Sequence, residues 1–176
     1  MDVLKAMEEK AFWGHEFLTW LWYRTETEGG ELEVPGVGPV TLWVDDRLVL
    51  ASLDTESKEN ILREGAVSQC AEAVAALTVG KKVQEARFGL VRDDREWSFV
   101  LKGDTFDLAT VKLPKVEAEE GDDWQATALI RAGLIRECLE VLDGLFRDFV
   151  ELRISARWVD ETLPAMGRWI AEKQGG

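Results

Sequence analysis

Strict alternation of apolar and polar residues marks one part of the chain as a sheet. Apolar side chains occupy every second position in 86–90 and again in 97–101. Asp93-Asp94 separates these two segments, and Gly103-Asp104 precedes a third segment at 105–113. A period of two places successive side chains on opposite faces of a strand. The pattern therefore predicts an antiparallel meander with one apolar face.

A helical pattern covers residues 12–24, which are rich in tryptophan. One side of this helix carries Trp13, Phe17, Trp20 and Leu21. Leu18 and Trp22 widen the apolar arc to well over half of the circumference, so two surfaces must cover the helix. We expect a sheet on one side, and either a second helix or a partner chain on the other. Leu18 and Trp22 are therefore candidate interface residues for self-association.

Helical periodicity returns in the last third of the chain. Residues 124–152 form one apolar stripe, which consists of Ala128, Ile135, Cys138, Leu139, Leu142, Phe146 and Phe149. A helix of this length crosses a whole sheet. The pattern over residues 156–171 predicts a last helix. Pro164 either kinks this helix or is the first residue of a separate segment. A shorter helix is expected at 69–79, with Gly80 as its stop.

The remaining segments complete an α+β pattern. Val40–Val44 and Arg47–Leu50 flank Asp45-Asp46, which predicts a tight hairpin, and Asn60–Arg63 predicts a short strand. Residues 115–123 are acidic and lack apolar periodicity, as expected of a solvated linker. We therefore expect a single domain over residues 1–176: an antiparallel meander packed on one face by the tryptophan-rich helix and the long C-terminal helices.

The composition excludes several classes of protein. Lys and Arg total 21 against 34 Asp and Glu, a net charge of −13 that repels nucleic-acid phosphates at long range. Cys70 and Cys138 lie far apart, which argues against a disulfide framework and against zinc. The sequence has no signal-peptide pattern and no apolar run long enough for a membrane span. It predicts a soluble, cytoplasmic protein without a membrane, cofactor or metal partner.

The catalytic motifs in the sequence are weak. His15-Glu16 begins like a zinc-protease helix, but Thr19 stands where the second histidine is needed, so His15 is interpreted as a solvated or hydrogen-bonded surface residue. Asp46 followed by Glu56-Ser57-Lys58 matches the outline of a Mg²⁺-dependent nuclease. Short acid-x-Lys motifs recur by chance in so acidic a chain. No catalytic residue is assigned, and the sequence favours a protein that is not an enzyme.

Three consecutive strand motifs resemble a known family. They are Gly80-Lys81-Lys82-Val83, then Arg95–Leu101, then Asp104–Leu108 with Val111-Lys112-Leu113. The series is similar to the later, C-terminal part of the recombination-associated RdgC family. The tryptophan-rich helix and the Asp45-Asp46 segment resemble the part of that family that precedes these strands.

The resemblance implies a non-enzymatic, DNA-associated α+β protein that self-associates around double-stranded DNA and restrains recombination. Its candidate nucleic-acid-binding residues in this chain are Lys81, Lys82, Arg87 and Arg95. The chain has only about the length of the later half of that family. Two alternatives stay open: an acidic protein–protein interaction or oligomerisation module that has lost DNA binding, and the Mg²⁺-dependent nuclease.

Overall fold

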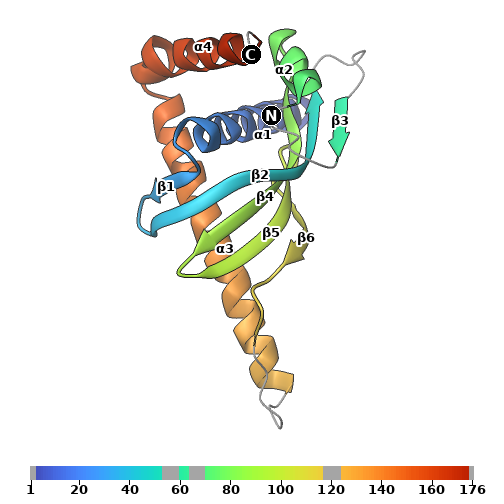
Figure 1. Ribbon diagram of the computed structural model, residues 1–176, viewed down its shortest axis with the longest axis vertical. Coiled ribbons are helices and arrows are strands. Elements are labelled where there is room, and N and C mark those ends of the chain that lie inside the picture. The colour runs from blue at the N-terminus through green and yellow to red at the C-terminus, as the bar shows by residue number, and fades with distance from the viewer. Residues whose placement is uncertain (1–2, 53–59, 64–69, 117–123, 175–176) are drawn as a thin grey trace.

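The structure is a computed structural model that describes residues 3–52, 60–63, 70–116 and 124–174. Within these residues it is an α+β protein, in which helices cover one face of a six-stranded antiparallel sheet (Figure 1). The strands are β1 (Glu31–Val34), β2 (Gly38–Ala51), β3 (Asn60–Arg63), β4 (Lys82–Arg92), β5 (Arg95–Lys102) and β6 (Leu108–Lys112). They lie in the order β1-β2-β4-β5-β6, and β3 pairs with β2. The predicted fold class is confirmed.

The helices are α1 (Val3–Thr27), α2 (Ala71–Thr78), α3 (Trp124–Arg153) and α4 (Leu163–Gln174), and a π-helical segment, Trp158–Thr162, precedes α4. In Figure 1, α3 runs behind the sheet and extends beyond it at one end, while α2 and α4 lie together at the other end. Pro164 is the second residue of α4. The chain is helical without a break from Ala156, because Arg157 and Leu163 on either side of the π-helical segment have αR backbone angles and the N–H of Leu163 donates to the carbonyl oxygen of Trp158. Pro164 therefore follows an irregular turn inside one continuous helical run and does not begin a separate segment. None of the helices in the described parts of the chain is both long and apolar enough to cross a lipid bilayer.

The central hairpin follows the alternating pattern in the sequence. Asp93 and Asp94 adopt positive φ angles of 49° and 61°, as in the tight turns that join antiparallel strands. Phe88 pairs with Phe99 across the hairpin, and both are fully buried on the face that the helices cover. Trp97 on the same face donates its indole N–H to the carbonyl oxygen of Leu134 in α3 at 3.0 Å. The alternation therefore predicted both the strands and the face that became the core.

The predicted hairpin at Asp45-Asp46 is wrong, because β2 is one continuous strand. The strand shifts register against β4 between Val44 and Leu48, which is a bulge rather than a turn. β4 is long enough to pair with both halves of β2, and Arg87 of β4 lies 3.4 Å from the carboxylate of Asp46. The two aspartates interrupt the apolar alternation without reversing the chain. The predicted short strand at Asn60–Arg63 is confirmed and pairs with β2.

An unusually close backbone contact seats α1 on the turn between β5 and β6. A Cβ atom added to Gly14 would lie 2.6 Å from the carbonyl carbon of Gly103 and 2.9 Å from its Cα. Position 14 must therefore be glycine for the helix and the turn to approach so closely, whereas a Cβ atom added to Gly103 would lie 3.0 Å from the carbonyl carbon of Gly14 and require a small shift. Next to this contact, the ring N–H of His15 donates to the carboxylate of Asp104 at 2.5 Å. His15 is 3% exposed, so the interpretation of a surface residue is wrong, while its hydrogen bond is present.

Aromatic side chains fill the space between α1 and α3. Phe149 of α3 lies at their centre and makes ring contacts with Trp13, Phe17, Trp20, Phe146 and Trp158. Two of these pairs, with Trp13 and Trp158, meet edge to face, the geometry that aromatic quadrupoles favour. The tryptophan-rich helix is therefore a structural element at the centre of the core.

Candidate interaction surface

Leu18 and Trp22 lie inside the chain. Both are fully buried, and the ring of Trp22 meets the ring of Trp169 edge to face at 5.2 Å. Trp169 belongs to α4, which returns over the side of α1 that the sheet leaves uncovered. The wide apolar arc of α1 is therefore covered by a helix of the same chain. This finding corrects the prediction that Leu18 and Trp22 form an interface.

The four basic residues predicted to bind DNA are not brought together. Lys81 and Lys82 lie at the start of β4, Arg87 lies in its middle, and Arg95 lies beyond its far end. An 11-residue strand spans roughly 35 Å. Lys82 and Arg95 contact acids on the helices, at 3.0 Å and 2.8 Å, whereas Arg87 contacts Asp46. These cations are distributed along the sheet and do not form one groove.

The face of the sheet that the helices leave open is also occupied by side chains of the sheet itself. The indole of Trp43 lies across Gly89, where any Cβ atom would overlap the ring. Arg47 forms an ion pair with Glu85 in the neighbouring strand. Arg87 and Asp46 form a second ion pair on this face. The described side chains around Trp43 therefore pair cations with acids and present no excess of positive charge.

Two polar clusters anchor α1 in the fold. Glu16, which is 8% exposed, lies between two cations: Lys82 of β4 at 3.0 Å and Arg153 of α3 at 2.6 Å. The hydroxyl of Thr19, one turn further along α1, accepts a hydrogen bond from the backbone N–H of Val83 at 2.9 Å. Each of these bonds joins the helix to an element distant in sequence. Their chemistry is that of a structural anchor, because each carboxylate oxygen of Glu16 already binds a cation.

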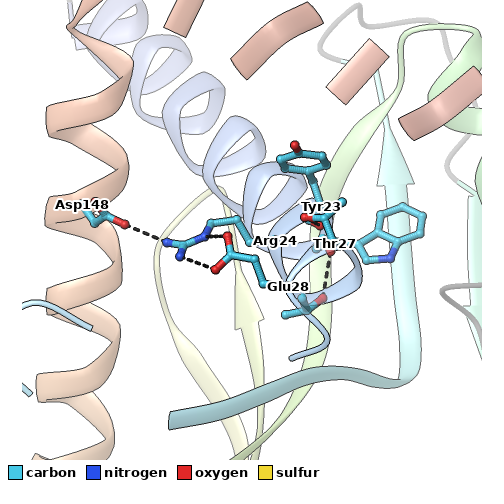
Figure 2. A network of polar contacts seen from close by, with 7 residues as sticks. Tyr23, Arg24, Thr27, Glu28 and Asp148 are labelled. Carbon is cyan, nitrogen blue, oxygen red and sulfur yellow. Dashed lines mark hydrogen bonds and ion pairs between the residues drawn. The ribbon is translucent and has the colours of Figure 1, made fainter. Parts of the chain in front are cut away.

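The second cluster surrounds Arg24 near the end of α1 (Figure 2). The guanidinium donates two hydrogen bonds to the carboxylate of Glu28, at 2.6 Å and 2.7 Å, and a third to Asp148 of α3 at 2.7 Å. It also lies over the ring of Trp20, 5.1 Å from the ring centre. A cavity of about 620 Å³ adjoins this cluster, between α1, α3 and the segment 155–165 that leads into α4. Acids on its walls already engage the arginine, so the cluster joins helices and offers no vacant anion site.

The described residues hold no group of three or more side chains suited to a metal ion. Asp46, the first acid of the predicted nuclease motif, contacts Arg87. The other two residues of that motif, Glu56 and Lys58, lie outside the described residues, as does most of the predicted linker at 115–123. The nuclease hypothesis therefore stays a prediction.

The most unusual surface is the first half of α3, residues 124–139, which we call the arm. From Trp124 to Gly133 no residue of the arm is buried, and in Figure 1 this part of α3 extends past the sheet. The large apolar side chains exposed here are Trp124 (75%), Leu129 (74%), Ile130 (49%), Ile135 (42%) and Leu139 (48%). A helix that is apolar on several sides is normally covered.

The sequence pattern predicted this helix and its stripe, but not that the stripe is exposed at its beginning. Ile135 and Leu139 belong to the same stripe as Leu142 and Phe149, which are buried in the core. Periodicity alone does not reveal where the sheet beneath the helix ends. A signal was nevertheless present, because Leu129 and Ile130 lie outside the stripe and make this half apolar on further sides.

Comparison with known proteins does not assign the chain to a family. No protein-family model matches the sequence, and no curated protein matches it. The resemblance to the RdgC family therefore stays a prediction, which rests on the strand motifs described above.

Proposed function

We propose that the chain is a non-enzymatic protein-interaction module whose contact element is the arm of α3. The observation that carries this proposal is the exposure of five large apolar side chains on one projecting half-helix. Single exposed apolar residues are common on soluble proteins, but contiguous groups of them mark contact sites. Tryptophan, which is enriched at such sites, stands at the beginning of the arm.

The distribution of charge supports the same proposal. The arm carries Arg131 and Arg136 against a single acid, Glu137, on a chain whose net charge is −13. Glu137 is in turn engaged by Arg95, at 2.8 Å. Interface centres are depleted of charged residues relative to the rest of a protein surface. The arm is therefore a largely apolar surface that does not share the acidic excess of the chain.

A photo-crosslinking experiment in cells tests the arm directly. We expect a photoreactive amino acid in place of Leu129 to attach the chain covalently to another polypeptide. The matched control is the same amino acid in place of Ile154, because both side chains are 74% exposed and only Leu129 belongs to the arm. Adducts that form at Leu129 and not at Ile154 support the proposal. Equal adducts at both positions, or none at Leu129, would contradict it.

Duplex DNA binding, implied by the RdgC resemblance, is the second hypothesis, and its support is weaker. It predicts an affinity for duplex DNA that falls steeply with salt, because cations that bind phosphates release counterions. Replacement of Lys82 and Arg87 by glutamine is then expected to weaken binding. The slope of log affinity against log salt concentration is expected to become less steep by roughly one unit for each phosphate-binding cation removed. The measurement is a fluorescence anisotropy titration over a salt series. No binding at low salt would contradict this hypothesis.

A further inference from the structure

We propose that the partner of the arm is a second copy of this chain, packed antiparallel to the first arm around a twofold axis. This inference rests on the proposed function, because it names the occupant of the same surface. Two observations carry it, the spacing of the exposed apolar residues and their sizes, and the charge of the arm is compatible with it.

The apolar residues on one side of the arm have a symmetric spacing. Trp124, Ala128, Ile135 and Leu139 follow one another at intervals of four, seven and four residues. Such intervals keep side chains on one face of a helix, as in a pair of packed helices. The two outer residues and the two inner residues share one midpoint, between residues 131 and 132. An antiparallel copy therefore superimposes the stripe on itself, as a twofold interface requires.

Side-chain size is complementary in the same arrangement. The twofold axis places Trp124 opposite Leu139 of the other copy, and Ala128 opposite Ile135. Each large side chain at the inner positions thus faces a methyl group, which leaves room for it to insert between turns of the opposite helix. Arg131 and Ala132 lie equally close to the axis, and Arg131 of each copy faces Ala132 of the other. The small alanine leaves room for the aliphatic stem of the arginine, whose charged end reaches the edge of the contact.

The charge of the arm is compatible with a second copy at this surface. Two chains of net charge −13 repel each other wherever their acidic surfaces meet. The arm, with Arg131 and Arg136 against Glu137, lacks the acidic excess of the chain, so two copies approach through it without bringing acids together. Salt screens the remaining repulsion between the two bodies. The dimer is therefore expected to become tighter as salt is added, opposite in sign to the salt dependence of DNA binding.

The size of the interface sets the expected strength. The 16 residues from 124 to 139 span about 24 Å of helix. A helix pair of this length lies at or below the roughly 1,200 Å² that marks the low end of specific interfaces. We therefore expect a reversible dimer with a dissociation constant of roughly micromolar order.

Site-directed crosslinking tests the geometry of the purified full chain. Cysteine in place of Ala132 lies near the axis, so a short bis-maleimide is expected to join two copies efficiently. The matched control is cysteine in place of Gln125, which points in a similar direction around the helix. In the antiparallel dimer the two cysteines at position 125 are separated by about 20 Å along the helix axis, which is too far for a short linker to join them.

Both variants carry Cys70→Ser, so that the introduced thiol is the accessible one. Cys138 is left in place, because burial raises the pKa of its thiol to about 12 and keeps it protonated at neutral pH. Circular dichroism checks that each variant is folded. A crosslinked product at position 132 that greatly exceeds the product at 125 is the expected result.

A second measurement follows the monomer–dimer equilibrium without a crosslinking reagent. Analytical ultracentrifugation is expected to give a monomer–dimer equilibrium, which Ile135→Asp weakens about tenfold or more. The control Ile154→Asp replaces an exposed isoleucine outside the arm and is expected to leave the equilibrium unchanged. Ile135 is 42% exposed in the monomer, so this substitution is compatible with the fold.

The outcomes separate this inference from the proposed function. A monomer at all accessible concentrations, or crosslinking at 125 that equals crosslinking at 132, overturns the antiparallel dimer. In that case arm-specific adducts with a different polypeptide in the cellular experiment still support an interaction module. If no adduct forms at Leu129 and ultracentrifugation shows only monomer, both proposals fail together.

Discussion

Alanine in place of Gly14 is expected to lower the free energy of unfolding by about 3 kcal/mol or more, although alanine is the stronger helix former. The new methyl group would overlap the backbone of Gly103, and a backbone does not move aside as a flexible side chain does. Helix α1 and the β5–β6 turn must then separate, which also strains the hydrogen bond between His15 and Asp104. Urea unfolding followed by tryptophan fluorescence measures the change.

The same substitution at Gly167 provides the control. Gly167 lies in α4 with no atom within 4 Å of an added Cβ, so alanine there is expected to stabilise the protein by about 0.5–1 kcal/mol. The two glycine-to-alanine changes thus have opposite signs for reasons that only the packing supplies. A Gly14→Ala variant as stable as the parent would show that the helix does not seat on the turn as described.

Removal of the Glu16 carboxylate is the second change with a large expected effect. Glu16→Ala is expected to lower the free energy of unfolding by about 2–3 kcal/mol, because it takes away the acid that Lys82 and Arg153 share. The value is below the upper end for buried pairs, since both cations keep some access to water. Arg153 also lies over the rings of Trp13 and Trp158, so its displacement would disturb the aromatic core.

Two companion variants define the cause of that effect. Glu16→Gln keeps the shape and removes the charge, so it is expected to recover only part of the stability. Glu161→Ala breaks an exposed ion pair with Arg157 within one helical turn, and is expected to change the free energy of unfolding by less than about 0.5 kcal/mol. Thermal unfolding compares all three. A destabilisation by Glu16→Ala no greater than that by Glu161→Ala would contradict the role of Glu16 as an anchor.

The sequence predicted the elements whose signal is local. The period of two in β4 and β5, the aspartates of their turn, and the long periodicity of α3 each determine an element without reference to the rest of the chain. The Asp45-Asp46 prediction failed because a bulge and a hairpin interrupt an apolar strand in the same way. The length of β4, a distant segment, decides between them.

The candidate site depended on non-local packing, which is why less of it was predicted. The wide apolar arc at Leu18 and Trp22 required a second covering surface, and the sequence alone does not say that α4 supplies it. The stripe of α3 was predicted as core along its whole length, yet the sheet beneath it covers only the later part. The four basic residues were chosen from motifs near one another in sequence, and strand geometry distributes them along the sheet.

The position of Gly133 gives the arm a further property. This glycine stands just before Leu134, the first buried residue of α3, so the ten residues from Trp124 to Gly133 hold their helix without burial in a core. Helical segments this short are marginal in water, and glycine lowers the helical preference where the arm leaves the body. Backbone amides of the arm should therefore exchange with deuterium far faster in the monomer than amides of the buried half. Contact with a partner would protect them, so exchange rates in this segment report occupancy residue by residue.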